Sequence, residues 1–361
     1  MQIKSNTNAN THKNTETHST QKFTQIKLGV DVHADSYRVV RQIDSATPQP
    51  AQKMTPAQFV RFAKKQLELA QEVYSCYEAG PFGYGLHRQL QAMGVHNVVV
   101  RPQNWDELGR GVKTDRTDAL ALVQRLDRYV QGNNKALAVV TVPTPQQEQA
   151  RAQSRHRQQL QKDRQTHEAQ GRSLLLSQGY RIKGPWWKEC SWPGLKARLA
   201  GWLVEILENF RQLILRADQL LEQITLQIES QAQAQPKGFG LLTSQSLHRE
   251  VLDWHRFNNR RQVASLTGMC PGVRASGLKS QTGSITKHGN PRLRRALVEL
   301  AWRVVRFQPG YGPVVRWRAV LAQKQNRAAR KKAIVAIGRQ LAIDIWRLET
   351  GRTTLEKLQL I

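Results

Sequence analysis

The chain has 361 residues, and 39% of them are hydrophobic, which is enough apolar material for a folded core. Lysine and arginine number 55 against 27 aspartate and glutamate residues, so the formal net charge is +28 at neutral pH. This balance favours a polyanionic partner such as nucleic acid over a small acidic substrate, and the length predicts two or three domains. The excess of positive charge is unevenly distributed along the chain, because 20 basic residues and only two acids lie in the segment from Arg256 to Arg347.

Cysteine usage and the N-terminus predict the compartment. Cys76, Cys190 and Cys270 lie far apart without a Cys-x-x-Cys pair, which excludes a standard structural zinc site and favours a reducing environment. The N-terminus has no apolar signal core, and no apolar run is long enough to span a bilayer. We therefore expect a cytoplasmic protein that acts on nucleic acid, without a membrane partner.

The N-terminal third shows strands alternating with helices. Residues 1–24 are almost all polar and predict a disordered tail. Beyond them the apolar spacing predicts, in chain order, strands over 26–33 and 37–43, a helix over 56–70, a strand over 73–78, a helix over 83–93 and a strand over 98–100. Thr114 is the expected N-cap of the next helix. This order predicts an α/β domain over residues 25–142.

A helical linker is expected over residues 143–235, and Pro143 and Pro145 mark its start. Residues 146–180 are rich in Gln and Arg and favour a helix. Apolar residues then recur at spacings of four and three, which predicts a coiled-coil helix: Leu203, Leu207, Phe210, Ile214, Ala217, Leu221, Ile224 and Ile228. Its partner is either segment 146–180 folded back or the same helix of another subunit. Residues 236–361 are expected to form a mainly helical C-terminal domain.

Four carboxylates of the N-terminal domain form a candidate metal site. Asp31 and Glu78 end apolar strands, where ligands bind in α/β folds, and Asp115 and Asp118 share one face of a helix. Carboxylate oxygens suit Mg²⁺, and two such ions can hold both oxygens of an in-line displacement at phosphorus. The order strand-Asp, strand-Glu, helix-Asp-x-x-Asp resembles the ribonuclease-H and RuvC-like nuclease fold.

Each of these acids has an ordinary alternative role. An Asp after a strand is commonly a turn or cap residue, and an Asp in the first turn of a helix is commonly a dipole partner. Four neighbouring acids are interpreted as surface or capping residues: Asp35, Asp106, Glu107 and Asp127.

A second candidate site lies in the glycine-rich segment 268–295, which holds Ser276, Ser280 and Ser284. Glycines permit close backbone approach, and basic groups hold phosphates. The candidate nucleic-acid contacts are Arg274, Lys279, Lys287, Arg292, Arg294 and Arg295. A basic surface loop with solubilising serines explains the same composition equally well.

Longer motifs carry a resemblance to a known family. They are GVDVH with Asp31, YEAG with Glu78, TDRTDA with Asp115 and Asp118, DWHRFNNRRQVASLTGMCP at 253–271, ASG at 275–277 and GSITKHGNPRLRRALVELAW at 283–302. Through them the chain, from about Lys27 to Tyr311, resembles the DEDD-type transposases of bacterial insertion sequences, family one-ten, in its eleven-eleven-like branch.

The resemblance implies an RNA-guided DNA recombinase with a RuvC-like domain. Such proteins bind a structured non-coding RNA, the bridge RNA, whose loops pair with donor and target DNA. The resemblance implies one or two Mg²⁺ ions at Asp31, Glu78, Asp115 and Asp118, and Ser276 as the nucleophile that forms a phosphoserine link to DNA. It also implies a homo-oligomer, dimer to tetramer, in which one subunit's acidic domain meets another's serine domain.

One departure sharpens the assignment of the nucleophile. The family pattern Ser-Glu-x-Ser-Ser-Gly is here Gly272-Val273-Arg274-Ala275-Ser276-Gly277, so Ser276 alone can fill the role at that step.

Three other functions remain open from the residues. A Mg²⁺-dependent nuclease or junction resolvase needs only the carboxylates, and a non-catalytic nucleic-acid-binding protein needs neither site. An actin-like ATPase would use GVDVH as a phosphate loop, but no second phosphate loop or P-loop follows, so no nucleotide cofactor is expected.

Overall fold

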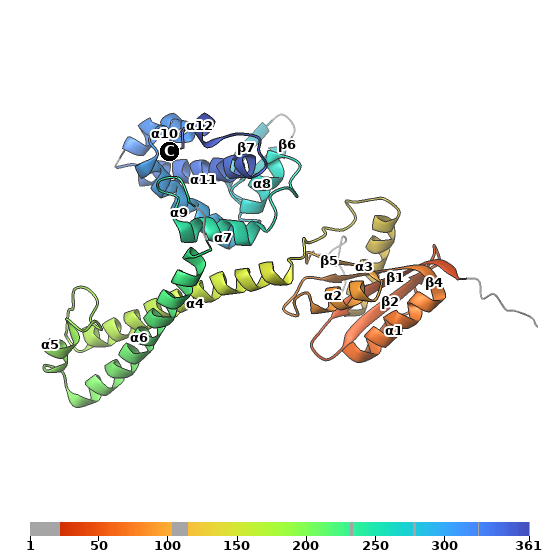
Figure 1. The fold of residues 1–361 in the computed structure, drawn as a ribbon, viewed down its shortest axis with the longest axis horizontal. Coiled ribbons are helices and arrows are strands. Elements are labelled where there is room, and N and C mark those ends of the chain that lie inside the picture. The colour runs from red at the N-terminus through yellow and green to blue at the C-terminus, as the bar shows by residue number, and fades with distance from the viewer. Residues whose placement is uncertain (1–21, 103–114, 232–233, 277–278, 324, 361) are drawn as a thin grey trace, which may run out of the picture. The chain divides into compact units, whose positions relative to one another are not determined.

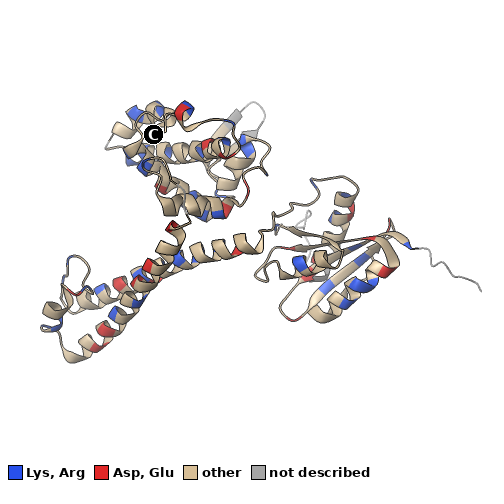
Figure 2. Ribbon diagram, viewed as in Figure 1, with Lys and Arg blue, Asp and Glu red and all other residues tan. Residues whose placement is uncertain are grey.

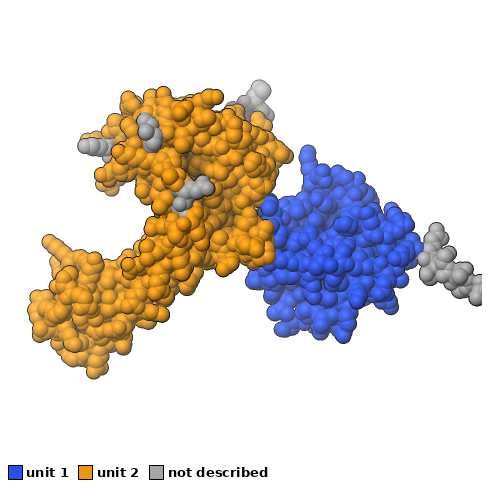
Figure 3. Space-filling model, in the orientation of Figure 1, with its two compact units in different colours: residues 1–142 blue, residues 143–361 orange. Residues whose placement is uncertain are grey.

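The computed structural model describes residues 22–102, 115–231, 234–276, 279–323 and 325–360. The chain divides into two compact units, residues 1–142 and 143–361, which are coloured separately in Figure 3. None of the helices in these described ranges is long and apolar enough to cross a lipid bilayer. Most of the predicted tail lies outside the described residues. Its last two residues correct the prediction, because Phe23 and Thr24 already belong to the first strand, where Phe23 pairs with Ala70.

The first unit is built on a five-stranded mixed sheet, which Figure 1 shows with helices packed on it. Its strand order is β3-β2-β1-β4-β5. Its strands are β1 (Phe23–Val32), β2 (Tyr37–Ile43), β3 (Gln52–Met54), β4 (Ala70–Glu78) and β5 (His96–Val100). Its helices are α1 (Pro56–Leu69), α2 (Gly85–Ala92) and α3 (Asp115–Val130). Strands β1, β2 and β3 pair antiparallel, whereas β4 and β5 extend the sheet in parallel on the other side of β1.

The two faces of the sheet are covered by different helices. Ile26, Leu28 and Val30 alternate along β1 and pack into one core with Phe59 of α1 and Leu90 of α2. The opposite face carries α3, whose buried side chains pack against the sheet in two smaller clusters. Alternation along a strand sends successive side chains to opposite faces, so β1 separates two cores.

Gly29 of β1 allows α3 to approach closely. A Cβ at this position would overlap the carbonyl oxygen of Ala119 and would lie 2.5 Å from the backbone nitrogen of Val123. A larger residue would therefore push α3 away from the strand.

The second unit begins with an antiparallel helical hairpin of α4 (Pro145–Ser177) and α6 (Gly201–Glu229). Side-chain pairs follow its length, from Gln153 with Gln227 at one end to Arg164 with Asp218 further along. The predicted seam of α6 thus finds a partner within its own chain.

The far end of the hairpin has its own small core, which includes the short helix α5 (Trp192–Lys196). There the ring of Trp186 lies against Gly171, where a Cβ would overlap it, and the indole nitrogen donates to the carbonyl of Glu168 over 3.0 Å.

The remainder of the second unit is mainly helical and packs around α11 (Arg327–Glu349). It also contains α7 (Leu241–Val251), α8 (Arg260–Thr267), α9 (Pro291–Phe307), α10 (Gly312–Ala322), α12 (Leu355–Leu358) and a two-stranded hairpin of β6 (Pro271–Ser276) and β7 (Lys279–Ile285). Lys and Arg residues recur along these helices, and acids are sparse (Figure 2).

Candidate catalytic and nucleic-acid-binding site

The ends of two neighbouring strands bring Asp31 and Glu78 together. Strands β1 and β4 run parallel with Val30 opposite Tyr77, and the next residues along the strands are Asp31 and Glu78. Both side chains are partly buried. In a parallel pair, residues at matching positions point to the same face, so the two carboxylates share one edge and one face of the sheet.

That face is the one that α3 covers. Lys27, Gly29 and Asp31 alternate along β1 on this side, and α3 runs in the opposite direction above them. Its residue Asp127 meets Lys27, and its residue Ala119 meets Gly29. The first turn of α3, which holds Asp118, therefore lies toward the Asp31 end of the strand. Asp115 begins the same helix, but its side chain is not among those that the structure describes.

The surroundings of the carboxylates are polar on one side and buried on the other. The Nε2 atom of His33 lies 3.2 Å from Oδ2 of Asp31. Burial raises the pKa of the Cys76 thiol, which lies on the same face of β4 as Glu78, and raises the pKa of Tyr77 to about 12 on the opposite face, so both side chains stay neutral at physiological pH. Within the described side chains, no three His, Cys, Asp or Glu residues are grouped closely enough to hold a metal ion together.

Ser276 is the last residue of β6, in the basic hairpin that β6 forms with β7. Its backbone pairs with Lys279, the first residue of β7, and Arg274 pairs with Gln281. The side chains of residues 274–280 lie outside the described part of the chain. The spacing in this segment predicted no strands, so the hairpin is a finding of the structure.

The other predicted nucleic-acid contacts have different environments. Lys287 and Arg292 are exposed, and Arg295 pairs with Glu299 over 3.0 Å on the surface of α9. Arg294 is partly buried and donates to the carbonyl oxygens of Thr267 (3.2 Å) and Lys287 (3.3 Å). Arg294 therefore holds the loop before α9, a role that its sequence position does not reveal.

Two ionic contacts were not anticipated from the sequence. Asp127, interpreted above as a surface or capping residue, instead pairs with the buried Lys27, because α3 folds onto β1. The signal that could have found it is Lys27 itself, a charged residue inside an otherwise apolar strand, which needs a partner when buried. Glu250 of α7 is also buried and accepts hydrogen bonds from Arg155 and Asn290.

Comparison with known proteins assigns the chain to a class. A family model described as "Transposase IS116/IS110/IS902 family" matches residues 233–314, the span from the end of the helical hairpin to the start of α10. A Sinorhizobium fredii protein described as "Putative transposase y4rJ" is 31% identical over 307 residues, which are 77% of each chain. The transposase for insertion sequence element IS1533 of Leptospira borgpetersenii is 25% identical over 80% of this chain and 87% of its own.

The transposase for insertion sequence element IS1111A of Coxiella burnetii is 24% identical over 74% of this chain and 75% of its own. The class is thus that of enzymes that cleave and rejoin DNA. The chain belongs to the IS116/IS110/IS902 family of transposases.

Proposed function

We propose that this transposase moves an insertion sequence by RNA-guided recombination, with a metal-dependent acidic site in the first unit and a serine nucleophile in the second. The observation that carries the proposal is the register of β1 and β4, which puts Asp31 beside Glu78 on the face that α3 covers. An acidic edge of this kind on a protein of net charge +28 repels a DNA phosphate unless cations lie between them.

The donor set fits Mg²⁺. Asp31, Glu78, Asp115 and Asp118 supply only carboxylate oxygens, which this hard cation prefers. One or two bound ions would neutralise the scissile phosphate and stabilise charge on the attacking and leaving oxygens. The protein's part is to hold the carboxylates on rigid elements, since two are at strand ends and two are in the first turn of α3. The mixed sheet with an acidic strand edge below a helix also supports a RuvC-like domain.

The proposed chemistry at Ser276 is an ester exchange. The Oγ atom bonds to phosphorus as the bond from phosphorus to a deoxyribose oxygen breaks. The hydroxyl proton leaves to solvent, and the departing sugar oxygen takes up a proton. A later attack by a sugar hydroxyl reverses the exchange and releases the serine. The number of phosphate esters is unchanged, so rejoining needs no ATP. Basic residues of the hairpin would stabilise charge on the phosphoryl oxygens.

A structured bridge RNA and a homo-oligomer complete the proposal. The Lys and Arg residues that recur along the C-terminal helices support binding of RNA as well as donor and target DNA (Figure 2). On α6 a second apolar row faces away from α4, and Trp202, Ile206 and Leu213 are each 41% to 51% exposed. Their spacing of four and seven is that of a coiled-coil face, which supports a further helix partner from another subunit in a dimer or tetramer.

The decisive experiment traps DNA on the protein. Wild type, Ser276→Ala and the matched control Ser284→Ala are incubated with element-end DNA and Mg²⁺, and denaturing gels then resolve covalent adducts. We expect an adduct in wild type and Ser284→Ala and none in Ser276→Ala. Cleavage that persists in Ser276→Ala would favour the metal-dependent nuclease instead.

Two further measurements test the metal and the RNA. Asp118→Asn should abolish cleavage while the affinity for DNA is retained or increased, whereas a non-catalytic binding protein would lose nothing. Purification with and without nuclease treatment, followed by sequencing of bound RNA, should recover one discrete RNA species. Recovery of only random RNA fragments contradicts guidance.

A further inference from the structure

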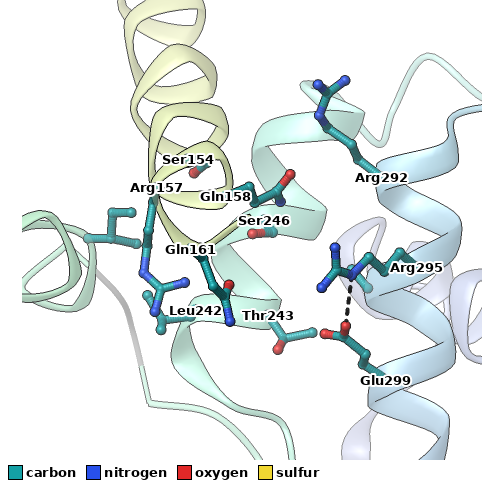
Figure 4. Close-up of a pocket in the computed structure, with 12 residues that line it drawn as sticks. Ser154, Arg157, Gln158, Gln161, Leu242, Thr243, Ser246, Arg292, Arg295 and Glu299 are labelled. Atoms are coloured by element: carbon teal, nitrogen blue, oxygen red, sulfur yellow. Dashed lines mark hydrogen bonds and ion pairs between the residues drawn. The ribbon is translucent and has the colours of Figure 1, made fainter. Parts of the chain in front are cut away.

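A polar hollow lies in the second unit, where the helical hairpin meets α7 and α9 (Figure 4). Its volume is about 90 Å³, well above the roughly 10–15 Å³ that one water molecule needs. Three arginines line it: Arg157 from α4, and Arg292 and Arg295 from α9. The acidic residue in its lining is Glu299, which accepts from Nε of Arg295. No hydrogen bond from another described residue occupies the other two nitrogens of that guanidinium.

Arg157 is fixed in place by the hairpin. Its Nε donates to Oγ1 of Thr225 across the α4–α6 interface over 2.8 Å, and no bond within the described chain occupies its two terminal nitrogens. Burial lowers the pKa of the Arg157 guanidinium, and the charge of Glu229 offsets this shift only in part. A partly desolvated guanidinium with two unused donors gains more from an anion than a fully solvated one does.

The remaining lining is rich in donors. Gln158 and Gln161 extend from α4 toward the hollow, and Thr243 and Ser246 face it from α7 (Figure 4). Their side chains make no hydrogen bond to another described residue. The first turn of α9 has no acidic residue, so its positive helix end adds to the potential of the nearby Arg292. The hollow therefore offers several hydrogen-bond donors to an oxyanion.

We propose that this hollow binds a backbone phosphate of nucleic acid, held by Arg157 and Arg295 and by the amides of Gln158 and Gln161. Planar guanidinium forks match the geometry of a phosphodiester, and the size of the hollow suits one phosphate group. Bound there, the strand ties the hairpin to α9, which follows directly on the serine-bearing segment. The inference rests on the proposed function only in that the ligand is nucleic acid.

The test measures affinity for a fluorescein-labelled 30-base-pair DNA duplex as salt is raised. Arg157→Gln should weaken binding roughly tenfold and lower the slope of log affinity against log salt by about one, because one phosphate contact is lost. The matched control is Arg216→Gln, an exposed arginine of the same hairpin outside the hollow, which should leave affinity and slope unchanged.

A variant that binds DNA more tightly serves as a control for misfolding. Glu299→Gln removes the negative charge from the hollow and should strengthen binding about two- to fivefold, a direction that a damaged fold does not produce. Melting temperatures of all variants confirm folding, and Arg157→Lys, which keeps the charge but not the fork, should fall between wild type and Arg157→Gln. The proposal is overturned if folded Arg157→Gln behaves as Arg216→Gln does.

Inorganic phosphate distinguishes a free anion from a nucleic-acid phosphate as the occupant of the hollow. If millimolar phosphate raises the melting temperature of wild type but not of Arg157→Gln, while both bind duplex equally, the hollow holds a free anion and nucleic acid is excluded. The proposed function is tested by a different measurement, the covalent adduct at Ser276. If the protein binds DNA through Arg157 but forms no adduct, only the serine chemistry is refuted.

Discussion

The ammonium of Lys27 in β1 donates to Oδ1 of Asp127 in α3 over 2.6 Å, although the two residues are 100 positions apart. The same nitrogen donates to the carbonyl oxygen of Asp44 over 2.9 Å, and Lys27 is only 2% exposed. The pair fixes the end of α3 that is remote from Asp118. It therefore sets how the helix lies across the strand that ends at Asp31.

Breaking this pair from one side should destabilise the first unit. Asp127→Asn leaves the Lys27 charge buried without its counter-charge, and we expect a loss of about 2–3 kcal/mol, reduced from the usual 3–5 because Asp127 is partly exposed. The double variant Lys27→Met with Asp127→Leu should recover most of that loss. Urea unfolding of the single and double variants measures the coupling. A double variant that loses as much stability as the two single changes added together would show that Lys27 and Asp127 are not coupled.

The close contact at Gly29 predicts that alanine destabilises the protein at this position but not at Gly85. Gly29→Ala forces a Cβ against the backbone of α3 and should cost about 1–3 kcal/mol, together with much of the metal-dependent cleavage. Gly85→Ala, at the start of α2 with no atom within 4 Å of the new Cβ, should be neutral or stabilise by up to about 1 kcal/mol. Thermal unfolding and cleavage rates compare the two. Equal stabilities would mean that α3 does not rest on Gly29.

The buried carboxylate of Glu250 predicts an acid-sensitive junction between the hairpin and the C-terminal helices. Burial by itself would raise its pKa, but hydrogen bonds from Arg155 and Asn290 and the charge of Arg151 hold the pKa of Glu250 below its usual value. A lowered pKa adds stability above the unfolded value near 4.5, and this stability is lost as pH falls through the folded value.

Glu250→Gln should therefore cost about 2–4 kcal/mol at pH 7 and progressively less below pH 4.5. Urea unfolding at several pH values measures the difference from wild type. The surface substitution Glu299→Gln serves as control and should change stability by less than about 0.5 kcal/mol at any pH. A penalty at Glu250 that stays constant with pH is the contrary result.

Tyr77 predicts alkaline destabilisation of the first unit. Burial raises its pKa to about 12, whereas an unfolded tyrosine titrates near 10. Between these values the unfolded chain releases a proton that the folded chain retains, so stability present below pH 10 is lost as pH rises to about 12. The loss should be about 1–2 kcal/mol by pH 11.5.

Tyr77→Phe should remove that component and change little at pH 8, because the hydrogen bond that the hydroxyl donates to the carbonyl of Gly83 is long, at 3.4 Å. Unfolding of both proteins at pH 8 and pH 11.5 isolates the contribution of Tyr77 from that of the lysines. Identical alkaline losses in the two proteins would show that Tyr77 titrates normally.

Local patterns predicted most elements of the first unit, because apolar residues recur along its strands and helices with clear periods. The strand expected over 26–33 is observed as β1 over Phe23–Val32, and the strand over 37–43 coincides with β2. The three-residue strand β3 was missed, since so short an edge strand has no periodicity of its own. The hairpin of β6 and β7 was missed because its glycines and serines are typical of loops.

The amino-acid sequence by itself determined the basic character of the chain, the α/β order of its first unit and the positions of Asp31 and Glu78 at strand ends. Tertiary structure decided what those positions face. The register of two strands 47 residues apart, the approach of α3 to Gly29 and the pairing of α6 with α4 all join distant segments. Local spacing cannot fix such contacts, because which of several apolar faces meet depends on the packing of the whole fold.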